Sequence, residues 1–277
     1  MNLEAYLKRI DYLHSLSPDL DTLTRLQEHH TRSIPFENLN PLLGIPVKLD
    51  RESLQQKLVN DGRGGYCFEN NGFFKMVLEE IGFEVTPLAG RVMWNQPEDV
   101  VARKTHMILL VHIHGADYLV DVGFGGYVPT VPLLFKPDLI QQTPHESYRL
   151  EKNENVYTLR IRVDEKWRIM YRFKADPVPQ IDYEVANWYT STCPACFFTT
   201  GLDVARADTG YRYTLRDNRF VIRNAEKKKE IRILSSVNEM KEVLRSYFKI
   251  RLPQADNLEA RLNDVLEMAK ADAGLRV

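Results

Sequence analysis

The sequence has few cysteines, little excess charge of either sign and no long apolar run. Its 277 residues contain three cysteines. Because no export signal is recognisable, so few thiols predict a chain folded in a reducing cytoplasm and not on a disulfide framework. The formal net charge of −1 argues against nucleic acid or an anionic membrane as a partner. No apolar run is long enough to cross a bilayer. With 44% hydrophobic and 27% charged residues, the composition is typical of a soluble globular protein.

The spacing of apolar residues changes twice along the chain. Up to about residue 82 the spacing is mostly helical. From there to about residue 234, short apolar segments alternate with turns, which favours a barrel or a sandwich. Helical spacing then returns over residues 236–269, where Ser236 and Glu239 form a capping box.

A single cysteine follows a glycine-rich turn and opens a predicted helix. Residues 61–70 read DGRGGYCFEN, and the helical pattern that begins at Cys67 stops at Gly82. A helix N-terminus favours thiolate over thiol, and the glycines allow a sharp turn that leaves the sulfur uncrowded. We therefore predict that Cys67 is a nucleophile. The alternative is a small buried apolar side chain, which is the commoner role of a cysteine taken alone.

A nucleophilic cysteine needs a base, and the base needs a group that orients it. His106 is the candidate base, because it opens a strand that is apolar on both faces. Asp121 lies in a second apolar strand, where a carboxylate needs a donor. A two-residue turn at Gly115-Ala116 would place Asp121 opposite Leu110, roughly 13 Å along the strand from His106. A bulge, a different turn or strong curvature has to close that gap.

Three further features have roles outside this constellation. Glu37 and Arg63 are expected to form a buried ion pair that supports the nucleophile turn. Cys193 and Cys196 have the spacing of a redox motif, but a loop with two incidental thiols is the simpler interpretation. Two sulfurs do not make a four-ligand zinc site, and no metal site is predicted. The lysines at 227–229 are expected to form a solvated turn.

Several segments occur in an order typical of one enzyme family. The sequence RGGYCFE at residues 63–69 matches the nucleophile motif, and residues 105–106 and 120–125 match the histidine and aspartate segments. Shorter matches lie at residues 34–39, 90–95 and 187–191. Together these segments resemble the arylamine N-acetyltransferases. The chain beyond them is similar mainly in pattern.

The resemblance implies an α+β fold in three parts around a Cys-His-Asp core similar to that of cysteine proteinases. The expected parts are an N-terminal helical bundle over residues 1–83, a central antiparallel β-barrel over residues 84–195 and a C-terminal α/β lid over residues 196–277. Cys67 belongs to the first part, and His106 and Asp121 belong to the second.

The reaction implied by the resemblance is acetyl transfer from acetyl-coenzyme A to a small aromatic amine or hydrazine, without a metal. The Cys67 thiolate would accept the acetyl group as a thioester, which the amine would then attack. His106 would move protons in both steps, and Asp121 would orient His106. Backbone N–H groups around Cys67 are the expected oxyanion donors.

Side chains beside the motifs are candidates for ligand contacts. Phe124 is the first candidate for contact with a flat substrate, followed by Phe36 and Phe68, for which core packing is the alternative. Gly125 and Gly126 are expected to let the pantetheine arm of coenzyme A approach the backbone. Gly126 also departs from some relatives, which carry a bulkier or basic residue there, and Asn70 stands where many relatives carry glutamine.

Two other functions are compatible with the same residues. A cysteine hydrolase would use the same triad and pass the acyl group to water. A ligand-binding protein on an inactive scaffold would bind without turnover. The physiological amine, the range of acyl groups, the place of the coenzyme's adenine and the oligomeric state are left open by the sequence.

Overall fold

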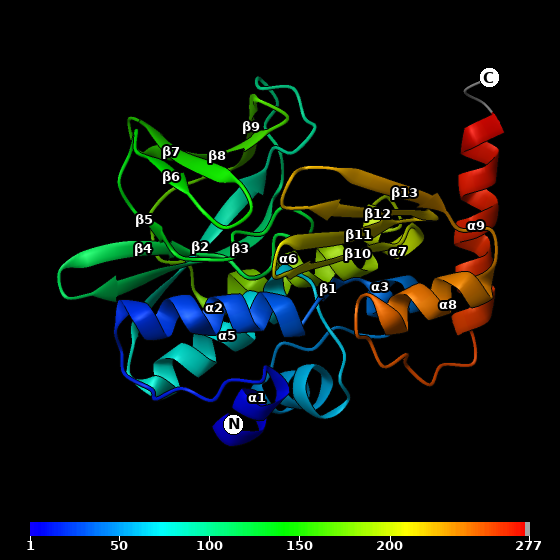
Figure 1. The fold of residues 1–277 in the computed structure, drawn as a ribbon, viewed down its shortest axis with the longest axis horizontal. Helices are drawn as coiled ribbons and strands as arrows, with labels where there is room; N and C mark the ends of the chain where they lie inside the picture. The colour runs from blue at the N-terminus through cyan, green and yellow to red at the C-terminus, as the bar shows by residue number, and fades with distance from the viewer. Residues whose placement is uncertain (275–277) are drawn as a thin grey trace.

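A computed structural model describes residues 1–274. Figure 1 shows the blue and cyan helices of the N-terminal part below a green β-structure, with a yellow-orange sheet and two further helices beside them. The helices are α1 (Leu3–Arg9), α2 (Leu20–Ser33), α3 (Leu39–Leu43), α4 (Arg51–Leu54), the π-helical η1 (Gln55–Asn60), α5 (Cys67–Ile81), α6 (Gln180–Thr192), α7 (Phe197–Thr200), α8 (Val237–Ser246) and α9 (Leu258–Gly274).

Two antiparallel sheets complete the fold. The larger one forms a nearly closed barrel in the order β5 (Leu133–Leu134), β4 (Ala116–Val120), β3 (Lys104–Ile113), β2 (Glu84–Val92), β9 (Lys166–Phe173), β8 (Val156–Val163), β7 (Ser147–Asn153) and β6 (Ile140–Gln142). The smaller one has the order β1 (Phe36–Glu37), β10 (Asp203–Asp208), β11 (Tyr211–Arg216), β12 (Arg219–Asn224) and β13 (Lys229–Ile233). The predicted α+β class is confirmed, while the division at residues 83 and 195 stays a prediction.

The helix predicted after the glycine-rich turn is α5, and it begins at Cys67. The Glu69 carboxylate accepts a hydrogen bond from the Tyr66 N–H at 3.1 Å, which satisfies one of the donors left free at the start of a helix. Gly82 ends the helix with φ +106°, in the left-handed region that glycine adopts without strain. The thiol therefore lies at the positive end of a helix of 15 residues.

The hairpin of β3 and β4 has a different register from the predicted one. Its two turn residues are His114 and Gly115, with φ +48° and +80°, as a type I′ turn requires. Leu109 pairs with Val120, the last residue of β4, so this register leads Asp121 toward Ile108 and not toward Leu110. The predicted turn at Gly115-Ala116 is wrong by one residue. The correct turn brings Asp121 two residues closer to His106.

A β-bulge next to His106 reshapes the same region. Gly90 of β2 pairs with His106, whereas Arg91 pairs with Lys104, so Thr105 is an extra residue on β3. Bulges bend a strand locally and re-aim the side chains beside them. The earlier turn and this bulge together account for the gap that the simple register left between His106 and Asp121.

The smaller sheet combines one strand from the N-terminal part of the chain with four strands from the C-terminal part. Phe36 on β1 pairs with Ala205 on β10 and also forms a parallel bridge with Gly65 in the nucleophile turn. The C-terminal sheet is thereby held against the segment that leads into Cys67. Within residues 1–274, no helix has the length and apolar character needed to span a membrane.

Candidate active site

Cys67, His106 and Asp121 lie together, although they come from α5, β3 and the segment after β4. His106 Nε2 donates to Asp121 Oδ2 at 2.7 Å, and both side chains are buried. The Cys67 side chain lies close enough to His106 to help raise the pKa of the imidazole. Because Asp121 occupies Nε2, Nδ1 is the ring nitrogen left for the thiol. The structure thus brings the three predicted residues into one continuous chain of contacts.

Asp121 is fixed by two further hydrogen bonds on its other oxygen. Oδ1 accepts from Asn71 Nδ2 at 2.9 Å and from the Gly123 N–H at 2.9 Å. The Asn71 side chain also accepts from the Val122 N–H at 2.8 Å and donates to the Met107 carbonyl at 2.8 Å. One amide therefore connects α5 to both strands of the hairpin and sets the direction from which Asp121 faces His106.

The electrostatics of the buried pair favour the charged forms of both partners. Burial alone would lower the pKa of His106, but the Asp121 carboxylate, its hydrogen bond to the ring and the nearby Cys67 side chain outweigh burial and raise that pKa to about 10. Burial would raise the pKa of Asp121, yet its contacts with His106, Asn71 and Gly123 lower it. An imidazolium held beside a thiol stabilises the thiolate, which is the reactive form of cysteine.

Gly123 makes the close approach of the hairpin to α5 possible. A Cβ at this position would lie 2.7 Å from the Cys67 Cα and 2.8 Å from Asn71 Nδ2, distances at which atoms clash. The absence of a side chain lets the chain after Asp121 pass directly over the start of the helix. Any larger residue would push Asp121 and Cys67 apart.

A cavity of about 540 Å³ opens onto the thiol. Cys67, His106 and the rings of Phe36 and Phe124 line one side of it, and the Phe124 ring meets His106 edge to face at 5.4 Å between centroids. Five cationic side chains from the C-terminal sheet also line the cavity: Arg212, Arg216, Arg219, Arg223 and Lys229. The lining therefore combines aromatic rings near the sulfur with positively charged side chains, a combination suited to an aromatic ligand and a phosphate-bearing one.

Comparisons with known proteins agree with these features. A family model described as N-acetyltransferase matches residues 19–257. The chain is 43% identical over 273 residues to the arylamine N-acetyltransferase of Mycolicibacterium smegmatis, covering 96% of this chain and 99% of that one. The chain belongs to the arylamine N-acetyltransferase family.

More distant and structural comparisons give the same result. The arylamine N-acetyltransferase of Escherichia coli K12 is 36% identical, with 91% of this chain and 90% of that one covered. The solved structure of Mycobacterium marinum arylamine N-acetyltransferase in complex with CoA has a TM-score of 0.92 at 39% identity, covering 95% and 99% of the two chains.

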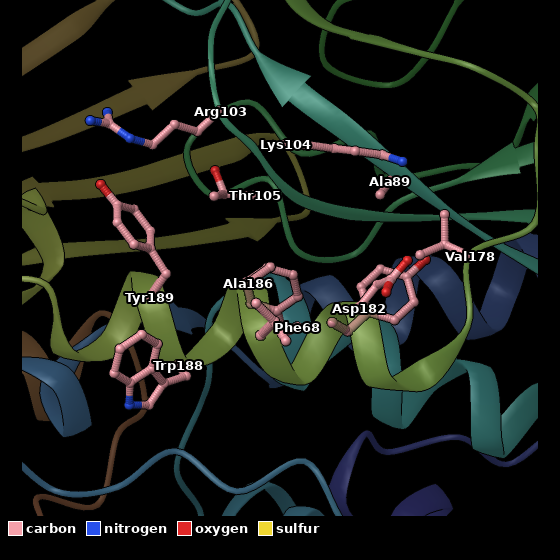
Figure 2. A pocket seen from close by; sticks show the side chains of 12 residues that line it. Phe68, Ala89, Arg103, Lys104, Thr105, Val178, Asp182, Ala186, Trp188 and Tyr189 are labelled. Carbon is pink, nitrogen blue, oxygen red and sulfur yellow. The ribbon is translucent and has the colours of Figure 1, made fainter.

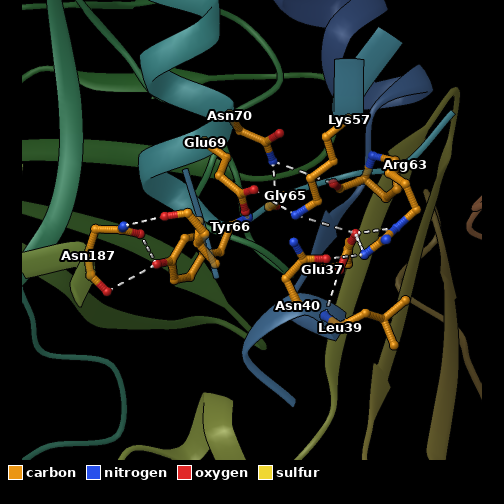
Figure 3. A network of polar contacts seen from close by, with 12 residues as sticks. Glu37, Leu39, Asn40, Lys57, Arg63, Gly65, Tyr66, Glu69, Asn70 and Asn187 are labelled. Carbon is orange, nitrogen blue, oxygen red and sulfur yellow. Dashed lines mark hydrogen bonds and ion pairs between the residues drawn. The ribbon is translucent and has the colours of Figure 1, made fainter. Parts of the chain in front are cut away.

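The nucleophile loop of this family member rests on a buried network of ionic contacts (Figure 3). Glu37 Oε1 accepts from Arg63 Nε at 2.9 Å and Nη2 at 2.7 Å, which confirms the predicted contact. Glu37 Oε2 accepts from the Leu39 N–H at 2.6 Å, and Lys57 pairs with Glu69 at 2.6 Å. Burial would raise the pKa of Glu37, but Arg63 and Lys57 outweigh it and lower that pKa. The network fixes the loop without contacting the thiol.

The glycines of the loop serve close packing more than turning. Gly62 alone of the loop glycines has a positive φ, at +64°. A Cβ on Gly64 would lie 2.1 Å from the Pro35 carbonyl oxygen, so the loop packs directly on the chain that leads into β1. Asn70, the position that departs from many relatives, donates to the Gly65 carbonyl at 2.8 Å and so supports the loop.

The predicted ligand contacts divide between two places. Phe36, Phe124 and Gly126 line the cavity at the thiol. Phe68 does not: it is buried against Tyr66 and lines a neighbouring cleft instead. Gly125 has φ +87°, and a Cβ at this position would lie 3.6 Å from the Phe36 ring.

Sequence reasoning missed Asn71 and the cationic residues that line the cavity. Asn71 lies one helical turn after Cys67, so its place on the same face of α5 was available from the pattern. The cationic residues lie on β11 to β13, where the family motifs fade and alternate residues face opposite sides. Among the described residues, no cluster of three or more histidine, cysteine or acidic side chains could hold a metal ion.

Proposed function

We propose that this enzyme transfers an acetyl group from acetyl-coenzyme A to the nitrogen of arylamines and arylhydrazines in two steps, through an acetyl thioester on Cys67. The observation that carries the proposal is a thiol that lines the cavity beside a buried, hydrogen-bonded His106–Asp121 pair. The cytoplasm is the proposed location, and the three-part division of the chain stays part of the proposal.

In the first step the Cys67 thiolate attacks the carbonyl carbon of acetyl-coenzyme A. The tetrahedral intermediate collapses with loss of the coenzyme thiolate, which takes a proton from the His106 imidazolium. The amine nitrogen then attacks the acetyl group on Cys67 and gives a proton to His106 as the cysteine thiolate leaves. This second transfer restores the starting charge state. Asp121 and Asn71 keep the imidazole oriented throughout.

The cationic side chains that line the cavity support coenzyme A as the acetyl donor. Arg216 and Arg219 form no ion pair with any described residue, whereas Arg212 is committed to Glu146 and Lys229 to Asp164. Arg216 and Arg219 are therefore the cations we assign to the coenzyme phosphates. Gly126 would leave room for the pantetheine arm, and Phe36 and Phe124 would stack on the aromatic amine beside the thioester.

Intact-mass measurement after incubation with acetyl-coenzyme A tests the proposal. We expect one acetyl group on the wild type, none on Cys67→Ala, and a normal level on the matched variants Cys193→Ala and Cys196→Ala. An arylamine should discharge the acetyl group much faster than buffer does. Equally rapid loss in buffer would identify a hydrolase, and a wild type that never acquires the group would support a binding protein.

A further inference from the structure

A second cleft lies beside the catalytic cavity, between α6 and the first residues of β3. It has a volume of about 580 Å³, within the ~300–1,000 Å³ range of small-molecule sites. Figure 2 shows Arg103, Lys104 and Thr105 along one wall, facing Asp182, Ala186 and Tyr189 of α6 on the other. Thr105 lines both cavities, and its carbonyl oxygen accepts from the Cys67 thiol at 3.5 Å. The two sites therefore adjoin without being the same site.

The floor of the cleft is apolar and aromatic. Phe68, Ala89, Val178 and Ala186 line it together with Tyr183, whose ring lies 6.2 Å from that of Phe68. A flat apolar ligand would bury its faces against these side chains. Such a lining does not select for charge, so the charged residues at the rim determine what else the ligand carries.

The charges at the rim leave one cation without a counter-charge. Lys104 and Asp182 lie toward one end of the cleft, and Arg103 lies at the other end above Tyr189, 5.5 Å from the ring centroid (Figure 2). Arg103 packs on the Tyr189 ring and forms no ion pair with any described residue. Two cations and one carboxylate leave a net positive charge, and the guanidinium fork of an arginine matches a carboxylate.

Tyr183 lines the cleft, but its hydroxyl is buried. Tyr183 is 2% exposed, and its Oη has no hydrogen-bond partner among the described residues. Burial raises the pKa of Tyr183, so the hydroxyl keeps its proton and remains a donor. Tyr183 therefore contributes its ring to the lining of the cleft, and no ligand contact is assigned to its hydroxyl.

We propose that this cleft binds a planar aromatic monocarboxylate, with the carboxylate on Arg103 and the ring against the apolar lining of the cleft. The site is separate from the acetyl-transfer site, so the two ligands bind at the same time. This proposal does not depend on the reaction assigned to Cys67.

Calorimetric titration with 2-naphthoate and its neutral analogue 2-naphthamide tests the assignment. For the wild type we expect a dissociation constant of about 1 mM or below for naphthoate, and about tenfold weaker binding of the amide. In Arg103→Gln the two ligands should bind with the same low affinity, because the charge that distinguishes them is gone. Arg103 is exposed, so this variant is expected to fold normally.

Two cavity-filling variants distinguish the two sites. Ala186→Phe should abolish naphthoate binding and leave acetylation of Cys67 intact, whereas Val221→Phe, which fills the catalytic cavity, should leave naphthoate binding intact. The proposal is overturned if the wild type binds no naphthoate, if Arg103→Gln still prefers naphthoate over the amide, or if Val221→Phe abolishes binding. If Ala186→Phe fails to fold, the Arg103→Gln comparison decides.

Discussion

Two buried ion pairs lie near the nucleophile, one beside the thiol and one behind its loop, and only the first contains a group that can release a proton. His106 lies beside Cys67 and lines the cavity, and Asp121 holds the far side of the imidazole ring. Glu37 and Arg63 are equally buried but lie behind the loop, where they contact backbone and other fixed side chains. An arginine does not release its proton in a protein, whereas a histidine does. Both pairs are buried, but His106–Asp121 serves proton transfer at the thiol, whereas Glu37–Arg63 fixes the position of the loop.

The two pairs also depend differently on pH. The pKa of His106 is raised to about 10, so its contribution to stability is complete below the unfolded value of about 6.5 and is lost as the pH rises through about 10. The pKa of Glu37 is lowered, so its contribution is present above the unfolded value of about 4.3 and is lost as the pH falls through the folded one. Alkali therefore weakens the first pair, and acid weakens the second.

The largest expected effect comes from removing the base. His106→Gln should lower kcat for acetyl transfer by about 10³–10⁴-fold, because neither step retains a proton carrier. Steady-state turnover of an arylamine measures the loss, and circular dichroism checks the fold. A variant that is folded and retains a tenth or more of wild-type activity would contradict the assignment.

Breaking the Glu37–Arg63 pair should lower the stability of the fold and should not alter the chemistry at Cys67. Glu37→Gln leaves Arg63 buried without its counter-charge and should lower the free energy of unfolding by about 3–5 kcal/mol. The matched variant Glu79→Gln breaks an exposed pair with Lys75 and should cost at most about 1 kcal/mol.

Urea denaturation at neutral and acidic pH measures both variants. The difference between wild type and Glu37→Gln should shrink as the pH falls below about 4. The structural role is wrong if Glu37→Gln leaves folding and activity unchanged.

Two adjacent asparagines on one helical turn divide the same two roles, orientation of the catalytic pair and support of the loop. Asn71 holds Asp121, whereas Asn70 holds the Gly65 carbonyl in the loop. Asn71→Ala should lower kcat by about 10–100-fold and change the pH–rate profile, because the orientation of Asp121 is lost. Asn70→Ala should lower the melting temperature and leave that profile in place. If the two variants behave alike, the division of roles is wrong.

A smaller effect is expected from the one carboxylate that lines the cavity. Burial raises the pKa of Asp203 to about 6, and Arg216 opposes this rise. Above about pH 6 the ionised carboxylate offsets the Arg216 charge that we assign to coenzyme phosphate. Asp203→Asn should therefore lower the KM for acetyl-coenzyme A a few-fold at about pH 8 and have little effect at about pH 5. An equal change at both pH values would rule out ionisation as the cause.

Local patterns predicted more of the site than the long-range geometry. The helix from Cys67 to Gly82 follows from apolar spacing and a glycine stop, and it is present. The contact between His106 and Asp121 was expected from two polar residues in apolar strands. The strand register that brings the two side chains together was not predicted. The turn uses His114 in a left-handed conformation, which a non-glycine residue seldom adopts, and this moved the register by one residue.

What the sequence could not reveal depends on tertiary contacts. Phe68 follows the nucleophile directly, yet helix geometry turns its side chain to the other cleft. Arg216 and Arg219 reach the cavity only because β1 pairs with β10 and carries the C-terminal sheet to the nucleophile loop. Neither placement has a local signal, since each is set by pairing between segments far apart in the chain.

The rate of Cys67 alkylation by iodoacetamide, measured against pH, tests the contrast between the two ion pairs most directly. For the wild type we predict fast alkylation that persists well below neutral pH, because the imidazolium favours the thiolate. The profile should move toward that of a free thiol in His106→Ala and in Asp121→Asn, and should stay in place in Glu37→Gln. A wild-type profile matching a free thiol, or a Glu37→Gln profile that moves as far as Asp121→Asn, would contradict this account.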